Sequence, residues 1–303
     1  MISKCIYKQF VSAIISLPQF LKELSFFPSG RWDILTDKDI LIKLPQEDTV
    51  ASLNLSMKLI DNDNFKDTFQ FQNALYGSLL VNDASKKWLL ELGARYNHHS
   101  RYGDNQTFTV SPSYVIQPGL RIISSVSSGF KAPSLYQISY NTALKAETSV
   151  NAELGVDYKS NPVDARIVYF NRTINNGIDY NYIDYNFFNF IKQKVNGIEI
   201  ELNHRLPHGQ SVGVNYTLLN GQETNQNRIT TTDTITYNYL LKRPKHSLQM
   251  QYNIAINKKW QASLSGRYIS SRYDVGGYAT QDVKLDYYTL LNAHLQYQAS
   301  KGL

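Results

Sequence analysis

The chain has 303 residues, of which 42% are hydrophobic, 13% aromatic and only 18% charged, and its formal net charge is +6. No uncharged apolar run approaches the roughly 20 residues of a membrane-spanning helix, which excludes a helical membrane core. The single cysteine, Cys5, excludes an intramolecular disulfide and any cysteine-based zinc site. A Tyr-rich, charge-poor chain of this kind is typical of a surface that alternates residue by residue, as in a transmembrane β-barrel.

Residues 1–44 are treated as an uncertain N-terminal segment, separate from the region 45–303. Lys4 and Lys8 precede an apolar run from Phe10 to Leu17, which weakly resembles a signal peptide, but no small-x-small cleavage site follows. We expect this segment to be an upstream remnant or the product of a mis-set start.

From about residue 50 onward, apolar and polar residues alternate with a period of two. The clearest example sets Leu154 and Val156 against Glu153 and Asp157. Clear alternation covers 89–96, 152–158, 198–205, 248–256 and 260–268, and less clean strands cover 51–59, 69–81, 120–130, 163–183, 188–197, 211–219 and 287–297. Several stretches exceed the five or six residues usual for soluble sandwich strands. We predict an all-β, antiparallel transmembrane barrel rather than a sandwich.

Short and long connections alternate along the chain, as in outer-membrane barrels. Short turns are predicted at 82–86, 117–119, 160–162, 206–209 and 257–259, and long polar loops at 98–106, 131–149, 221–244 and 271–285. A long hairpin over 163–206 has its tip near Asp184–Asn186. Trp88 and Trp260 follow short turns, and Tyr96 and Tyr268 lie eight residues further on the same faces, which predicts two aromatic girdles.

An ordered set of motifs begins near Trp88. It comprises ELGARYN (91–97), SGFKAPSL (128–135), Asn141, LKAE (144–147), NAELG (151–155), YFN (169–171), GIE (197–199), NYT (215–217) and RPKH (243–246). In this order the motifs resemble the C-terminal half of TonB-dependent outer-membrane receptors, in the vitamin B12 receptor-like and siderophore receptor-like branch. Ala146 departs from the usual proline. The resemblance implies mostly structural roles for the motif residues Gly129, Phe130, Pro133, Asn141, Glu147, Arg243 and Pro244.

The resemblance also implies a partial structure. Plugged outer-membrane transporters have about 22 strands, whereas we count about 12 here, and we expect the plug domain and the TonB-binding segment to be absent from this chain. Charged residues on the polar strand faces are expected to face the lumen or a plug. They are Glu91, Arg95, Glu153, Asp157, Glu199, Glu201, Arg205 and Arg267.

The implied function is active import of a large nutrient complex, cobalamin or a ferric siderophore, across the bacterial outer membrane. Implied partners are outer-membrane lipid, the TonB complex through the missing N-terminal part, and the nutrient ligand. Ring stacking and phenol hydrogen bonds suit such a ligand. The candidate contacts are Arg101, Tyr102, Tyr180, Tyr182, Tyr185, Tyr237 and Tyr239. A self-contained passive porin or an adhesion-type barrel is the alternative.

Other chemistry is set aside. The His98-His99 pair lies at a strand end and is interpreted as a solvated loop edge rather than a metal site, and no cofactor is expected. A barrel phospholipase needs a lipid-facing Ser–His pair, but the neighbours of His294 are the apolar Ala293 and Leu295, which places His294 on the lumen side. Lys and Arg are scattered without a basic stripe, so no nucleic acid is expected. The prediction is a receptor, not an enzyme.

Overall fold

The computed structural model describes residues 38–43, 49–61, 69–83, 85–181, 185–229, 233–276 and 281–299. The strands in these ranges belong to one compact unit, Leu35–Leu303. Most of the N-terminal segment 1–44, including its apolar run, lies outside the described residues. Within the described part of the chain, no helix is long and apolar enough to cross a bilayer.

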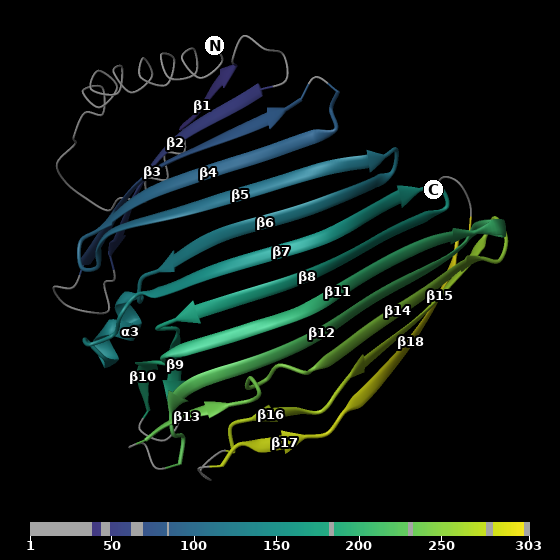
Figure 1. Ribbon diagram of the computed structural model, residues 1–303. Coiled ribbons are helices and arrows are strands. Elements are labelled where there is room, and N and C mark those ends of the chain that lie inside the picture. The colour runs from purple at the N-terminus through teal and green to yellow at the C-terminus, as the bar shows by residue number, and fades with distance from the viewer. Residues whose placement is uncertain are drawn as a thin grey trace. The chain divides into compact units, whose positions relative to one another are not determined.

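An antiparallel sheet of 14 strands dominates the structure and confirms the all-β prediction (Figure 1). Thirteen of its strands are paired essentially in chain order: β1 (Lys38–Lys43), β2 (Thr49–Asp61), β3 (Phe69–Asn82), β4 (Trp88–His99), β5 (Gly103–Gln117), β6 (Leu120–Lys131), β7 (Glu147–Ser160), β8 (Val163–Asn175), β11 (Lys192–Leu206), β12 (Gln210–Gln226), β14 (His246–Ala255), β15 (Trp260–Ile269) and β18 (Tyr288–Tyr297). The remaining strand, β13 (Thr234–Tyr237), pairs with β12.

The ladder is open between its first and last strands. Among the described residues, no pairing joins β1 to β18, which agrees with the predicted partial barrel. The ladder begins earlier than expected, because β1 falls inside the segment 1–44.

All five predicted short turns lie between successive strands, and they share one end of the sheet. The turn from β11 to β12 contains the 3-10 turn η1 (Pro207–Gly209). In the turn from β3 to β4, the Asp83 carboxylate accepts hydrogen bonds from the Ser85 hydroxyl and, at 2.7 Å, from the Trp88 backbone N–H. The hydrogen bond from Ser85 is the main cause, and that from Trp88 the second, of the lowered pKa of Asp83.

The opposite end carries longer connections, with one exception. The predicted long loop at 98–106 is wrong, because β4 continues to His99 and β5 starts at Gly103, with cross-strand pairs up to His99↔Gly103. Polar residues here extend the hairpin as strand instead of ending it. The other long loops contain α3 (Leu135–Tyr140), β9 (Ile178–Asn181) paired with β10 (Asn186–Asn189), and β16 (Arg272–Asp274) paired with β17 (Val283–Leu285).

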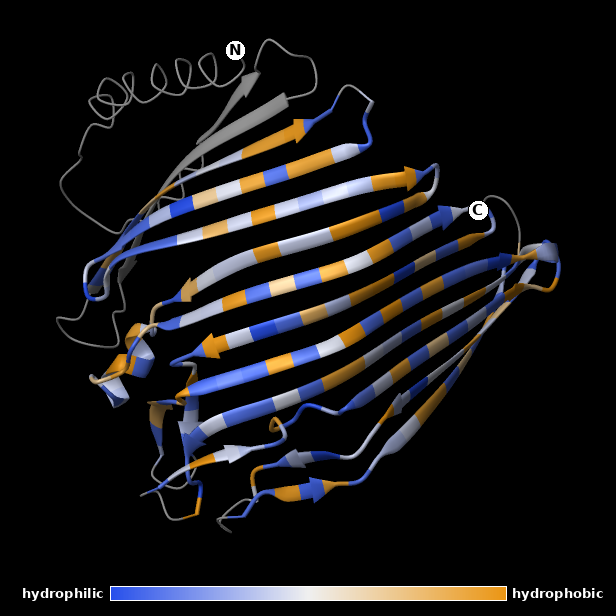
Figure 2. Cartoon of the chain, in the orientation of Figure 1, coloured by the Kyte–Doolittle hydropathy of each residue, from blue (hydrophilic) through white to orange (hydrophobic). Residues whose placement is uncertain are grey.

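The strand register places apolar side chains beside one another across the sheet. Leu154 pairs with Tyr169, Tyr169 with Ile198, and Ile198 with Leu218. Large side chains in these rows remain exposed, including Leu154 at 57% and Met250 at 49%, and Figure 2 shows apolar residues recurring along the long strands. We call this the apolar face and the opposite side the polar face. An apolar surface this continuous is suited to lipid rather than water.

Aromatic pairs mark the short-turn end of the apolar face. Trp88 packs on Tyr114 with ring centroids 4.4 Å apart, and Trp260 packs on Tyr297 at 4.7 Å. Eight residues further along the same strands, Tyr96 and Tyr268 lie on the same face. Eight strand residues span about 26 Å, which projects to about 20 Å along the membrane normal at a strand tilt of about 40°. The two girdles are therefore spaced to flank most of the apolar band of about 25 Å that is typical of such barrels.

A charge on the apolar face is expected to destabilise the barrel, whereas the same charge on the polar face is tolerated. We predict that Met250→Arg lowers the free energy of unfolding by about 2–4 kcal/mol, because the guanidinium enters lipid near the middle of β14. The neighbouring, exposed Gln249→Arg is the matched control and should cost less than about 1 kcal/mol. Denaturant titration in lipid vesicles measures both, and equal effects would contradict the assignment of faces.

Candidate functional site

The loop that contains α3 is built around a capped helical turn at the long-loop end. The Ser134 hydroxyl accepts a hydrogen bond from the Gln137 N–H at 3.2 Å, and the Gln137 side chain accepts one from the Ser134 N–H at 2.9 Å. This capping box starts the helix. The motif residue Pro133 is fully buried just before it, and Leu135 and Ile138 are buried within it.

The β9–β10 hairpin lies beside this loop (Figure 1), and side-chain amides connect the two. The motif residue Asn141 donates to the Phe187 carbonyl at 2.8 Å. Asn189 accepts from the Lys145 N–H at 2.8 Å and donates to the Lys145 and Asn176 carbonyls at 3.0 and 2.6 Å. The motif residue Glu147 accepts from the Ile178 N–H at 3.4 Å. Two loops distant in sequence are thereby held as one surface.

An aromatic cluster, which we call the α3 cluster, lies where these loops meet. The ring of Phe187 contacts those of Tyr136, Tyr140 and Tyr180 edge-to-face, with centroids 5.8, 5.7 and 4.9 Å away. Tyr136 and Tyr140 are 50% and 48% exposed. Sequence reasoning selected Tyr180 but missed Tyr136, Tyr140 and Phe187. The i, i+4 tyrosine spacing after a capping box was the available signal.

The predicted contacts Arg101 and Tyr102 hold the α3 loop through hydrogen bonds from the tip of the β4–β5 hairpin. Arg101 Nη2 donates to the Thr142 carbonyl at 2.6 Å, and the Tyr102 hydroxyl donates to the Leu144 carbonyl at 3.1 Å. Tyr185 is 57% exposed beside the hairpin tip and belongs to no described ring pair. Tyr182 lies outside the described residues.

A second set of loop residues joins the β12–β14 and β15–β18 connections. The Arg228 side chain is only 14% exposed, and it pairs with Glu223 at 2.5 Å and with Asp282 at 2.7 Å. Its guanidinium also lies 4.0 Å from the ring centroid of the predicted contact Tyr237. The two long loops are therefore held together by a buried ionic group, which we call the Arg228 cluster.

Tyr239, another predicted contact, is part of the same cluster. Its hydroxyl donates to Asp282 at 2.7 Å, and its ring stacks on Tyr273 at 3.9 Å. Burial first, and then the hydrogen bond to Asp282, raise the pKa of Tyr239 above the ordinary phenol value, which favours the protonated hydroxyl as the donor to Asp282. The Lys242 N–H also donates to the Tyr273 carbonyl at 2.7 Å. Tyr237 and Tyr239 thus pack within the loops, apart from the α3 cluster.

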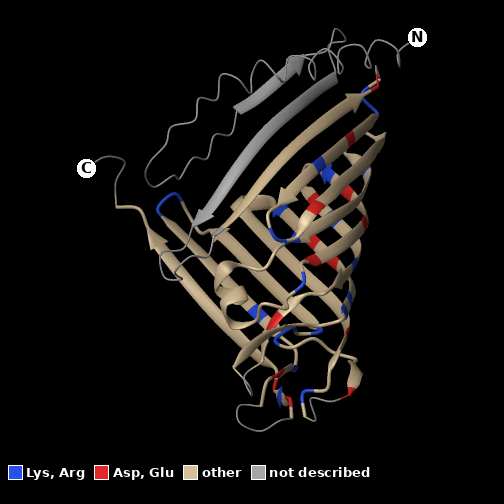
Figure 3. Ribbon diagram, turned by 90° about the vertical axis from the view of Figure 1, so that its left-hand side faces the viewer, with Lys and Arg blue, Asp and Glu red and all other residues tan. Residues whose placement is uncertain are grey.

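All eight charged residues predicted to face the lumen share the polar face by register: Glu91, Arg95, Glu153, Asp157, Glu199, Glu201, Arg205 and Arg267. Asp157 pairs with Arg166 at 3.5 Å and Arg205 with Asp164 at 3.0 Å. Figure 3 shows the uneven distribution of charge. The strands β14 and β18 contain no Lys, Arg, Asp or Glu.

A hollow of about 490 Å³ lies over β7, β8, β11 and β12 on the polar face. Glu153, Glu199, Glu201 and the motif residue Arg243 line it, and none of the four is ion-paired with another residue in the described part of the chain. The loop that carries Arg243 and Pro244 is anchored by buried Leu240, which occupies the space where a Cβ on Gly221 would lie. Leu240 therefore requires glycine at position 221.

Two further motif residues end β6. Phe130 pairs with Thr148 of β7. A Cβ on Gly129 would come within 2.6 Å of the Ser149 hydroxyl oxygen, so a larger residue here would require the Ser149 hydroxyl to rotate away. Both observations concern construction of the sheet.

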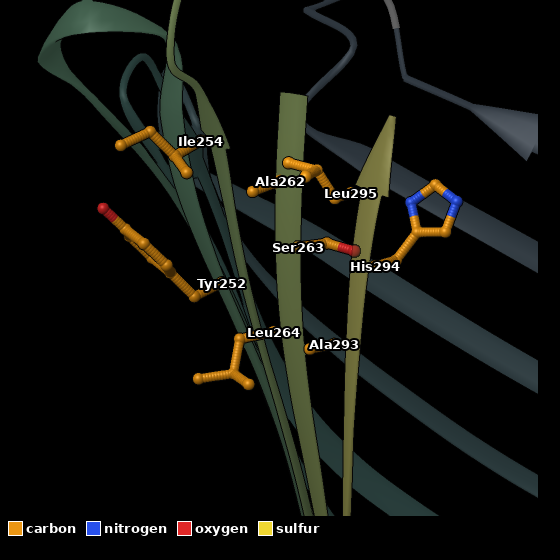
Figure 4. Close-up of a pocket in the computed structure, with 8 residues that line it drawn as sticks. All are labelled: Tyr252, Ile254, Ala262, Ser263, Leu264, Ala293, His294 and Leu295. Atoms are coloured by element: carbon orange, nitrogen blue, oxygen red, sulfur yellow. The ribbon is translucent and has the colours of Figure 1, made fainter. Parts of the chain in front are cut away.

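The structure does not place a reactive Ser–His pair with His294 on the apolar face. Ser263 and His294 are cross-strand partners, and Figure 4 shows them on one side of the sheet, with Tyr252, Ile254 and Leu264 on the other. The hollow of about 380 Å³ near them has a mostly apolar lining. His98 and His99 point to opposite faces, since successive strand residues alternate. The interpretation of this pair as a solvated loop edge is wrong for His99, which ends β4 and is 2% exposed, and holds only for the exposed His98.

The Arg228 cluster makes a stability prediction. We expect Arg228→Met to leave Glu223 and Asp282 buried without a counter-charge, at a cost of about 3–5 kcal/mol to the local structure. Limited proteolysis in micelles should then cleave faster within 227–245 and 271–287. Lys284→Met, an exposed cation on β17, is the control and should cleave like the wild type. An unchanged rate in Arg228→Met would show that the ion pairs do not hold the loops.

Comparison with known proteins places the chain in a family. A profile described as "TonB dependent receptor-like, beta-barrel" matches residues 26–303. The vitamin B12 transporter BtuB of Vibrio cholerae is 27% identical over 223 residues, which cover 70% of this chain and 34% of the transporter. The ferrienterobactin receptor of Escherichia coli is 26% identical over 196 residues, 52% of this chain and 26% of the receptor.

A solved structure supports the fold. A variant of the ferric enterobactin receptor PfeA of Pseudomonas aeruginosa, in complex with enterobactin, superimposes with a TM-score of 0.67 at 18% identity, covering 88% of this chain and 46% of that one. The match to the curated B12 transporter spans only about a third of the length of that protein. These relatives are transport receptors, in agreement with the prediction that the chain is not an enzyme. The chain belongs to the TonB-dependent receptor family, and it forms part of the β-barrel of an outer-membrane receptor.

Proposed function

We propose that this chain supplies wall strands and outer loops of a receptor that imports a large nutrient complex with energy coupled through TonB. The family profile over 26–303 supports the receptor class. The observation that carries the proposal is the α3 cluster, a set of aromatic rings held on loops tied together at the end opposite the short turns. Short turns face the periplasm in outer-membrane barrels, so this end faces the exterior.

The proposed ligand is cobalamin or a ferric siderophore, the ligand class of the relatives named above. A large and partly apolar ligand suits ring faces flanked by phenol hydroxyls. Tyr136 and Tyr140 offer half-exposed rings, and Phe187 fixes their orientation from within. Because the rings sit on a scaffold that is already hydrogen-bonded, little ordering cost accompanies binding.

The polar face is proposed to line the lumen, within a barrel portion covering residues 45–303. Glu153, Glu199, Glu201 and Arg243 lack ion-pair partners within the described residues around their hollow. Unpaired charges on the inner wall of a barrel are stabilised when a polar domain inside the lumen forms hydrogen bonds to them. We propose a plug segment as that domain, with the TonB-binding segment preceding it.

The α3 cluster makes a binding prediction. The double variant Tyr136→Ala/Phe187→Ala should weaken binding of ferric enterobactin or cyanocobalamin, whichever the wild type binds, by about 10- to 100-fold, since it removes one half-exposed ring and the ring that orients the others. Tyr185→Ala is the control, because that exposed ring lies outside the cluster. Fluorescence or radioligand titration in micelles measures the affinities. Equal losses in both variants would argue against the α3 cluster as the contact.

Energy coupling is tested by uptake in cells. Cells that express the chain joined to the proposed plug and TonB-binding segment should accumulate the labelled ligand, and deletion of TonB from the host should reduce uptake to background. A passive pore needs no energy source and continues to conduct down the gradient. Uptake that persists without TonB, or that fails to saturate with ligand concentration, would favour the porin alternative.

A further inference from the structure

The tip of the β4–β5 hairpin is organised around one buried imidazole. His99 is only 2% exposed. Its Nδ1 accepts hydrogen bonds from the backbone N–H groups of Arg101 and Tyr102, at 3.1 and 3.3 Å. The Tyr102 ring packs against the imidazole with centroids 5.1 Å apart. The conformation of the tip therefore depends on a nitrogen that carries no proton.

The same two residues whose N–H groups bind His99 also hold the α3 loop. Their side chains donate to the Thr142 and Leu144 carbonyls, across 41 and 42 residues of sequence. These carbonyls follow α3 directly, and Asn141 and Asn189 then connect the loop to Phe187. Contacts thus run from His99 through the tip to the aromatic rings without a break.

We propose that the β4–β5 tip is a positioning clamp for the α3 cluster, and that neutral His99 holds this clamp closed. Arg101 and Tyr102 then act as positioning residues rather than ligand contacts. The clamp itself is independent of which ligand binds; its consequence for binding rests on the function proposed above.

The proton-binding equilibrium of His99 follows from its surroundings. Burial, and secondarily the neighbouring His98, lower the pKa of His99. The charged groups around it are His98, on the opposite face of the strand, and Arg101 at the tip. Arg95 lies further along the same face and donates to Asn97, and the β3 partner of His99 is the neutral Gln72. Within the described residues, no carboxylate hydrogen-bonds to the His99 ring.

The direction of the pH effect can now be derived. A histidine whose pKa is lower in the folded tip than in the open tip binds a proton more readily when the tip opens. The closed clamp is fully stable above the ordinary histidine pKa of about 6.5 and loses stability as pH falls below it. A proton on Nδ1 also replaces an acceptor by a donor that faces two N–H groups.

Hydrogen exchange tests the clamp without any ligand. In the wild-type protein in micelles, amide protection of residues 134–146, corrected for the intrinsic exchange rate, should fall at least about tenfold from about pH 7.5 to about pH 5. His99→Asn places an amide oxygen near the position of Nδ1 and does not titrate. It should keep protection within about threefold of the wild type at pH 7.5 and show no fall at pH 5.

Two further variants separate the clamp from a general effect of pH. His98→Asn changes the neighbouring exposed histidine, which pairs with Asp104 on the other face, and it should retain most of the pH dependence, because burial is the larger cause of the lowered pKa of His99. Tyr102→Phe removes only the hydroxyl that reaches Leu144, and should lower protection at pH 7.5 by about threefold to tenfold.

Each outcome decides the proposal. Protection that is flat with pH in the wild type, or that falls equally in His99→Asn, would overturn the role of His99. Protection unchanged in Tyr102→Phe would overturn the clamp. If the exchange results are as expected but neither ferric enterobactin nor cyanocobalamin binds, the clamp stands and the proposed ligand class fails.

Discussion

The rest of this structure depends on the need to pair every backbone N–H and C=O group that enters lipid. Water is absent from the bilayer core, so each strand pairs its backbone groups with those of the neighbouring strands in a ladder. That ladder fixes the register, and the register in turn aligns Leu154, Tyr169, Ile198 and Leu218 in one row. Lipid-facing and lumen-facing surfaces are therefore consequences of backbone hydrogen bonding combined with the two-residue period of the sequence.

Beyond the membrane the same need is met by other means. The outer loops are not continuous sheet, and their carbonyls are satisfied by side chains of other loops. Asn141, Asn189, Arg101 and Tyr102 each donate to backbone carbonyls. The Arg228 cluster joins its two loops by buried charge instead. The two arrangements differ physically, since hydrogen bonds to carbonyls fix backbone position, whereas the ion pairs and stacked rings fix side chains.

The sequence predicted the strands and their faces well because alternation is a local signal. It predicted the short turns equally well, since Gly, Pro and Asn at 117–119 or 160–162 act locally. It failed at 98–106, where polar residues form strand because the hairpin extends beyond lipid. The α3 cluster could not be predicted from local patterns, because Phe187 and Tyr136 are about 50 residues apart in the sequence and meet only in the folded loops. Tyr237 and Tyr239 were chosen as candidate ligand contacts, but Arg228 and Asp282 lie against them, and no local pattern in the sequence indicates these partners.

The use of backbone carbonyls as acceptors has a consequence for how such a receptor diversifies. Thr142 and Leu144 are held through atoms that every amino acid possesses. Substitution of the exposed side chains on this loop leaves those acceptors in place, so the loop conformation is insulated from changes in its own sequence. Selection for a new ligand can thus act on the displayed residues while the donors remain constant, in the way that antibody loops vary on an invariant framework.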